Sequence, residues 1–132
     1  MGNIVDMLRK KDCFCSLTGV TEEEIKEAEQ TLDLTFAKEY VDYLQAFGLA
    51  SFQGHELTGI IKSPRLNVVA QTILGKEDNP RVPDDFYVIE IANVDGIAIW
   101  QKSSGEIFET VFDSNPVLIC GSLGDYIECY AV

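Results

Sequence analysis

The sequence is poor in positive charge and in long apolar runs, and each shortage excludes a class of protein. Only 10 of the 132 residues are Lys or Arg, against 22 Asp or Glu, which gives a formal net charge of -12. Such a chain repels the phosphates of nucleic acid and of anionic membranes, so neither is expected as a partner. No run of about eighteen apolar residues could span a bilayer, and the polar N-terminus does not resemble a signal peptide. We therefore expect a cytoplasmic protein.

Metal ligands and catalytic motifs are also scarce. The four cysteines, at positions 13, 15, 120 and 129, lack the paired spacing that is typical of a structural zinc site. We interpret Cys120 and Cys129 as small core residues. The single histidine, His55, has no sequence neighbour that suggests a nucleophile or a metal site, and it is interpreted as a loop residue. Since no glycine-rich phosphate loop or Gly-x-Ser-x-Gly motif is present, we expect no metal, no cofactor and no enzymatic activity.

One aromatic helix is the clearest structural signal in the chain. Between Thr35 and Gly48, apolar residues recur at steps of three and four, which places them on one buried stripe of a helix. Thr35 is a candidate N-cap, and Gly48 can take the left-handed conformation that ends a helix. The stripe consists of Phe36, Tyr40, Tyr43, Leu44 and Phe47.

Helices are also predicted on both sides of this stretch. Residues 21–32 begin with a capping box, and residues 63–75 begin with Ser-Pro, keep the three-four spacing and end at a glycine. A short helix is predicted before the basic run 9–11, because positive charge suits a helix C-terminus. Another helix is predicted to open at residue 122, so helices are expected at both ends of the chain.

The region between residues 87 and 120 is predicted to form strands. Four segments rich in Ile, Val, Phe and Tyr alternate with short turn-like breaks, which favours an antiparallel meander. Trp100 is interpreted as a core residue, and Gly96 as the positive-φ residue of a hairpin turn. The four segments are 87–92, 96–101, 106–112 and 116–120, and two shorter strands are expected at 49–52 and 56–61.

These elements predict one α+β domain over residues 1–132. Its antiparallel sheet is expected to have about four to six strands, packed by N-terminal and C-terminal helices. A chain of this length can bury roughly two thirds of its unfolded surface, so one core is sufficient.

The order of the elements resembles the SUKH superfamily, the Smi/Knr-like proteins, which include many bacterial immunity proteins. That family reads as an acidic helix, Leu-Pro-x-x-Tyr opening a second helix, an aromatic residue or Asn before Gly, and a short strand ending in Gly-Ile. Here Phe36-Ala37 replaces Leu-Pro, which keeps the apolar residue and loses the fixed-φ proline. The residues that match the family pattern are Phe36, Tyr40, Phe47, Gly48, Gly59 and Gly96.

The resemblance implies a non-enzymatic protein that binds a protein partner, which for an immunity protein is a cognate toxin. Many such toxins are nucleases with basic clefts, and an acidic surface can speed the encounter and cover the cleft. Residues 84–132 contain nine acids and one base, Lys102, so we expect the contact in this part of the chain. The candidate contact acids lie at predicted strand edges and turns: Glu90, Asp95, Glu106, Glu109 and Asp113.

Two other functions stay open at this point. A regulatory scaffold, which some eukaryotic Smi/Knr-like proteins resemble, would bind an endogenous enzyme instead of a toxin. A small acid-base enzyme would need a deep pocket with two close carboxylates, at least one of raised pKa. Paired acids in the sequence do not favour an enzyme, because a chain with 22 acids contains many pairs by chance.

Overall fold

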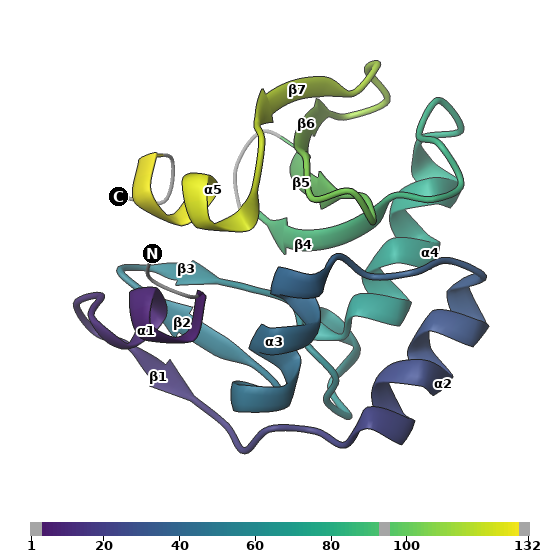
Figure 1. The fold of residues 1–132 in the computed structure, drawn as a ribbon. Coiled ribbons are helices and arrows are strands. Elements are labelled where there is room, and N and C mark those ends of the chain that lie inside the picture. Colours follow the sequence, from purple (N-terminus) through teal and green to yellow (C-terminus); the bar gives the residue numbers. More distant parts are fainter. Residues whose placement is uncertain (1–3, 93–95, 130–132) are drawn as a thin grey trace.

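A computed structural model describes residues 4–92 and 96–129 of the chain. A small sheet and most of the helices form one half of the molecule, and a larger sheet lies above them (Figure 1). The helices are α1 (Ile4–Arg9), α2 (Glu22–Leu32), α3 (Lys38–Phe47), the 3-10 turn η1 (Pro64–Leu66), α4 (Val68–Asp78) and α5 (Leu123–Cys129). The strands are β1 (Cys15–Ser16), β2 (Ala50–Phe52), β3 (His55–Glu56), β4 (Tyr87–Ile91), β5 (Ile97–Gln101), β6 (Ile107–Val111) and β7 (Val117–Cys120).

The α+β class is confirmed, and the strands divide into two sheets. The four predicted C-terminal strands form the antiparallel meander β4-β5-β6-β7, as the short breaks between them suggest. Strands β1, β2 and β3 form a separate antiparallel sheet. The predicted strand at 56–61 is shorter than expected, because beyond β3 the chain makes only isolated bridges, from Leu57 to Glu90 and from Gly59 to Asn67. The two sheets therefore meet at a bridge.

The predicted N-cap of the aromatic helix is wrong. Helix α3 has Ala37 at its N-cap, with no side-chain hydrogen bond there, and Thr35 lies outside the helix. Two distant residues accept from the free backbone N–H groups instead: Glu29 Oε2 accepts from Phe36 at 2.8 Å, and the Tyr87 hydroxyl accepts from Ala37 at 2.8 Å. The start of α3 is thus held by tertiary contacts.

The predicted start of α2 is confirmed, whereas the predicted start and end of the helix at 63–75 both differ from the structure. The capping box of α2 is confirmed, since Thr21 and Glu24 bond to each other's backbone N–H groups. The Ser-Pro pair opens only the 3-10 turn η1, and α4 begins after Asn67, whose side chain accepts from the N–H of Ala70 at 3.0 Å. Helix α4 also continues past Gly75, where a Cβ would lie 2.7 Å from the Trp100 ring. That glycine admits the ring instead of ending the helix.

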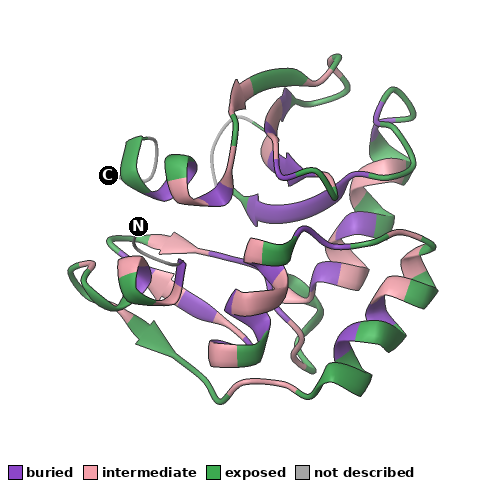
Figure 2. Cartoon of the chain, in the orientation of Figure 1, coloured by how far each residue is buried: buried purple, intermediate pink, exposed green. Residues whose placement is uncertain are grey.

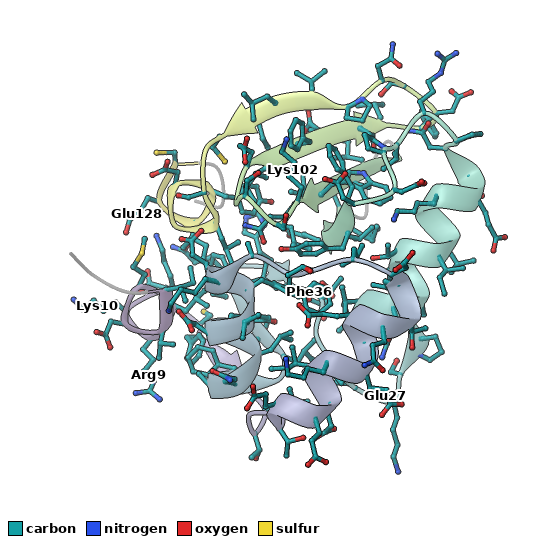
Figure 3. All side chains as sticks on the ribbon, turned by 45° about the vertical axis from the view of Figure 1, so that its right-hand side comes forward. Arg9, Lys10, Glu27, Phe36, Lys102 and Glu128 are labelled. Carbon is teal, nitrogen blue, oxygen red and sulfur yellow. The ribbon has the colours of Figure 1, made fainter. Side chains whose placement is uncertain are left out.

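The aromatic stripe of α3 is buried, as predicted, and Trp100 is a core residue. Phe36 lies in the middle of the molecule, beneath the larger sheet (Figure 3). Strand β4, which lies above α3, is buried along nearly its whole length (Figure 2). The stripe residues Phe36, Tyr40, Tyr43, Leu44 and Phe47 are each at most 3% exposed.

Buried hydroxyl groups connect α3 to β4 of the larger sheet through Thr58. The hydroxyls of Tyr40 and Thr58 are 2.8 Å apart, and the Tyr43 hydroxyl donates to the Thr58 carbonyl at 2.8 Å. Thr58 in turn donates from its hydroxyl to the carbonyl of Val88 and from its N–H to the carbonyl of Ile89, both at 2.8 Å. The hydroxyl groups of these tyrosines are therefore hydrogen-bonded inside the core, so their burial does not carry the free-energy cost of an unpaired polar group.

Two glycines of the family pattern, Gly48 and Gly59, lie where two backbones touch. A Cβ at Gly59 would lie 1.9 Å from the carbonyl oxygen of Gly48, and one at Gly48 would lie 2.5 Å from that of Thr18. Gly19 meets the carbonyl oxygen of Gln45 in the same way, at 1.8 Å. Gly48 also has a φ of 69°, which glycine adopts without strain. Only glycine fits these contacts.

We expect Gly59→Ala to lower the free energy of unfolding by about 3 kcal/mol, the upper end of the range for overpacking, because backbone atoms cannot yield to the new methyl group. Urea unfolding followed by circular dichroism measures the change. Gly121→Ala is the matched control, since a Cβ there meets nothing closer than Asp125 Oδ2 at 3.8 Å. Equal stability of the two variants would contradict the assignment.

The buried tyrosines predict an alkaline limit to stability. Burial raises the pKa of Tyr40, Tyr43, Tyr87 and Tyr126 above the ordinary value of about 10. The folded chain then keeps these protons to higher pH than the unfolded chain, so this contribution is complete below about pH 10 and is lost as the pH rises further. The urea midpoint should fall between about pH 8 and pH 11. A constant midpoint over that interval would disprove the prediction.

Candidate protein-binding surface

Glu90 does not lie on an exposed surface, contrary to the expectation for a contact acid. It is 5% exposed, and it sits in β4 at the bridge between the two sheets. Its Oε2 lies 2.8 Å from Nδ1 of His55, and the Tyr126 hydroxyl donates to its Oε1. Glu90 therefore connects β3, β4 and α5 from the inside and is not available to a partner.

The histidine of this cluster is also more ordered than the sequence suggests. His55 belongs to β3, not to a loop, and its ring stacks on Phe52 with centroids 5.5 Å apart. Burial and the neighbouring Glu90 carboxylate raise the pKa of Tyr126, so its hydroxyl keeps the proton that it donates. Within residues 4–92 and 96–129, no group of three His, Cys, Asp or Glu side chains could hold a metal ion.

The charge of Glu106 is partly compensated. The Ser104 hydroxyl donates to its carboxylate, and Lys102 Nζ lies 3.8 Å from Oε2. The hydrogen bond from Ser104 is the main cause that lowers the pKa of Glu106, with smaller effects from its own backbone N–H and from Lys102. Lys102 also lies over the ring of Phe108, 5.7 Å from the centroid. The only base in the C-terminal third of the sequence is thus already engaged.

Two candidate acids remain on the surface around the end of β6. Glu109 is half-buried, in register with Ile99 of β5 and Val117 of β7. Asp113 is exposed in the turn that follows β6. Asp95 lies outside the described residues. The structure therefore does not gather the five predicted acids into one cluster.

Uncovered apolar side chains lie beside these acids, and sequence analysis missed them. These side chains belong to β6, to β7 and to the turn between them. The two strands are the farthest from the helices that lie beneath the sheet (Figures 1 and 2). An apolar strand sequence shows that a residue belongs to a sheet, but it does not show which strands are left without a covering layer. The side chains are Val111 (40% exposed), Phe112 (70%), Val117 (60%) and Leu118 (59%).

Phe112 is held in an unfavourable backbone conformation. Its φ is 54°, which is rare for a bulky L-residue. Its N–H donates to the carbonyl of Gly96 at 2.9 Å, and its ring lies so close to Gly96 that a Cβ there would be 2.5 Å from ring carbons. The predicted positive φ of Gly96 is confirmed, at 66°. Gly96 thus provides the space that the Phe112 ring occupies.

Asn79, just after α4, fixes this turn. It is 2% exposed, and its Nδ2 donates to the carbonyl of Ser114 at 2.8 Å and to that of Phe112 at 3.4 Å. Inside the turn, Ser114 Oγ accepts from the N–H of Val111 at 2.9 Å. The backbone that carries the exposed Phe112 ring is therefore fixed by hydrogen bonds from Asn79 and within the turn itself.

A groove of about 580 Å³ runs between the end of α4 and the sheet, beside Phe112. Leu74 and Asp78 line it from α4, Trp100 from β5, and Phe112 and Asp113 from the turn after β6. Its walls are mainly apolar, with carboxylates on both sides. Within the described residues neither Asp78 nor Asp113 is in an ion pair.

The two C-terminal cysteines are less buried than predicted. Cys129 is exposed, which corrects its interpretation as a core residue, and Cys120 is partly buried. Burial is the main cause that raises the pKa of the Cys120 thiol to about 11, and the nearby Asp125 adds to it. Cys129 is exposed because it ends α5, after the buried residues of that helix.

Asn79→Ala should destabilise the protein by about 1–2 kcal/mol, because two turn carbonyls lose their donor. Urea unfolding reports the loss, and near-ultraviolet circular dichroism reports the surroundings of Phe112. Asn67→Ala, which removes the N-cap at the other end of α4, should cost about the same without changing the turn. An Asn79→Ala protein with unchanged stability would show that the turn holds without it.

Comparison with known proteins gives one family. The family model described as SMI1-KNR4 cell-wall, SUKH_5, matches residues 1–127. No curated protein shows significant sequence similarity to the chain. None of the helices in the described ranges has the length and apolar character needed to cross a bilayer.

Proposed function

Since this chain belongs to the SMI1-KNR4 family of SUKH proteins, we propose that it is an immunity protein, which neutralises a cognate toxin by stoichiometric binding. Proteins of this family generally bind other proteins. The proposal assigns no reaction to the chain: protection results from covering the toxin's working surface.

The observation that supports this function is the surface around β6 and β7. There, exposed apolar side chains lie on both faces of the sheet edge, because Val117, which pairs with Glu109, and Leu118 are successive residues of β7, while Lys102 is already paired with Glu106. Interfaces commonly combine an apolar centre with a polar rim. A surface of this composition fits a partner that is apolar at the contact and basic around it.

Each part of the surface has its own role in binding. The excess of carboxylates attracts a basic partner over a distance of about 8 Å at physiological salt, and it can raise the association rate toward about 10⁸ per molar per second. Burial of the apolar side chains stabilises the complex once it has formed, and this contribution depends little on salt. A toxin with a basic substrate cleft, such as a nuclease, meets both requirements.

A toxin encoded beside the gene is the test ligand. Glu109→Lys combined with Asp113→Lys should slow association with it by at least about tenfold at low salt. Glu23→Lys combined with Glu27→Lys is the matched control, because these exposed acids carry the same charge and belong to α2, which lies far from β6 and β7 (Figure 1). Glu27 is labelled in Figure 3. Surface plasmon resonance at several salt concentrations measures both rates.

Three results would count against the proposal in different ways. Unchanged association of the Glu109 and Asp113 variant would reject the electrostatic part. Failure of the wild-type protein to bind the toxin, or to protect cells that express it, would reject the immunity function. Capture of an endogenous enzyme in place of a toxin would favour the regulatory scaffold.

A further inference from the structure

Two residues at the groove beside α4 are unfavourable where they stand. Phe112 has a φ of 54°, a value that bulky residues rarely adopt. Asp78 is the last residue of α4, where the helix dipole disfavours negative charge. Lys76, the base of that last turn, donates to the Asp84 carbonyl at 2.5 Å and so is directed toward the chain after α4. Locally unfavourable residues tend to collect at functional sites.

The groove between these residues has the form of a binding site. Its apolar walls are contributed by Leu74, Trp100 and the Phe112 ring, and Asp78 and Asp113 stand on its two sides. The Trp100 indole N–H is already bonded to Thr110 Oγ1 at 2.9 Å, so Trp100 offers only ring carbon to the groove. An occupant must therefore be apolar along its length and positively charged at an end.

We propose that this groove binds an arginine side chain of a basic partner protein. The aliphatic part of the arginine packs against Leu74, the guanidinium group lies on the exposed face of the Phe112 ring, and Asp78 and Asp113 accept its N–H groups. Arginine fits better than lysine, because its planar group can stack on an aromatic ring and donate to two carboxylates at once. The inference rests on the proposed binding function and specifies the chemistry that it recognises.

A second copy of this chain is a poor occupant. Each copy carries a formal charge of -12, so two acidic surfaces would be brought together. Two of its three arginines are engaged elsewhere: Arg65 is bonded to Glu56 at 2.9 Å, and Arg9 lies over the Phe47 ring. Charge complementarity therefore points to a different, basic protein.

The direct test uses a short peptide in place of the unknown partner. An acetylated, amidated tri-arginine peptide is titrated into the ¹⁵N-labelled full chain, and tri-citrulline, its neutral analogue, serves as the control ligand. The amide signals of Asp78, Gly96 and Phe112 and the indole signal of Trp100 should shift with tri-arginine. Binding of tri-citrulline should be at least about tenfold weaker, because it lacks the charge.

Paired variants separate this site from general acidity. Asp78→Asn with Asp113→Asn and Glu23→Gln with Glu27→Gln each change the formal charge from -12 to -10. The first pair should weaken tri-arginine binding by about tenfold, and the α2 pair by less than about twofold. Equal weakening by both pairs, or shifts that cluster on α2, would overturn the proposal.

Phe112→Gly tests the role of the strained ring. Glycine accepts a positive φ without strain, so this variant should unfold at or above the wild-type temperature while it binds tri-arginine about tenfold more weakly. A lower unfolding temperature would indicate that Phe112 serves to pack on Gly96. Dimers at the groove, detected by light scattering and abolished by Phe112→Gly, would also overturn the proposal.

The cognate toxin separates this inference from the proposed function. If the wild-type protein binds the toxin and Phe112→Gly binds it equally well, the arginine site is wrong and the immunity function stands. If no toxin binds but the peptide is held at the groove, the immunity function is wrong and the arginine site stands.

Discussion

The packing of α3 against β4 depends on Thr58, which is 1% exposed and bonded on all sides. The hydroxyls of Tyr40 and Tyr43 reach it from α3, and Thr58 itself donates to two carbonyls of β4. Without the Thr58 hydroxyl, the buried Tyr40 hydroxyl would lose its partner, at a cost of about 1–3 kcal/mol. The Tyr43 hydroxyl bonds to the Thr58 main-chain carbonyl and also accepts from the N–H of Ala50. The helical layer and the larger sheet are therefore joined by a polar contact within an apolar core.

The contact between α3 and β4 determines which strands of the larger sheet are left without a covering layer. Because β4 is fixed on the helical layer, the strands that follow it extend progressively away from α3, and β7 becomes an outer strand of the sheet (Figure 1). Helix α4 covers part of the other face, where Gly75 admits Trp100. Val111 of β6 and Val117 and Leu118 of β7 then remain exposed, although the sequence of these strands is typical of a buried strand. Exposed apolar strands are uncommon in proteins that do not bind a partner there.

Among the described residues, four that are not glycine have a positive φ, Cys13, Asp33, Gln53 and Phe112, and of these Phe112 lines the groove. Helix α2 has a complete capping box and acids in its first turn, as helix stability favours. At the groove, by contrast, Phe112 has a positive φ, Asp78 ends a helix, and Asn79 holds the turn between them. Each such feature matters to the fold, because a domain is stable by only about 5–15 kcal/mol in total.

The sequence by itself determined the elements whose signals are local. Capping residues, three-four spacing, turn residues and the glycines of the family pattern predicted the α+β class, the meander and the buried stripe of α3, because each depends on neighbouring residues. The tertiary structure decided the partners of distant groups. Glu90 is buried with His55 and Tyr126, which are 35 and 36 residues away, and Ala37 bonds to Tyr87, 50 residues away. The exposure of Phe112 was decided in the same way, because only the packed chain shows which strands lack a cover.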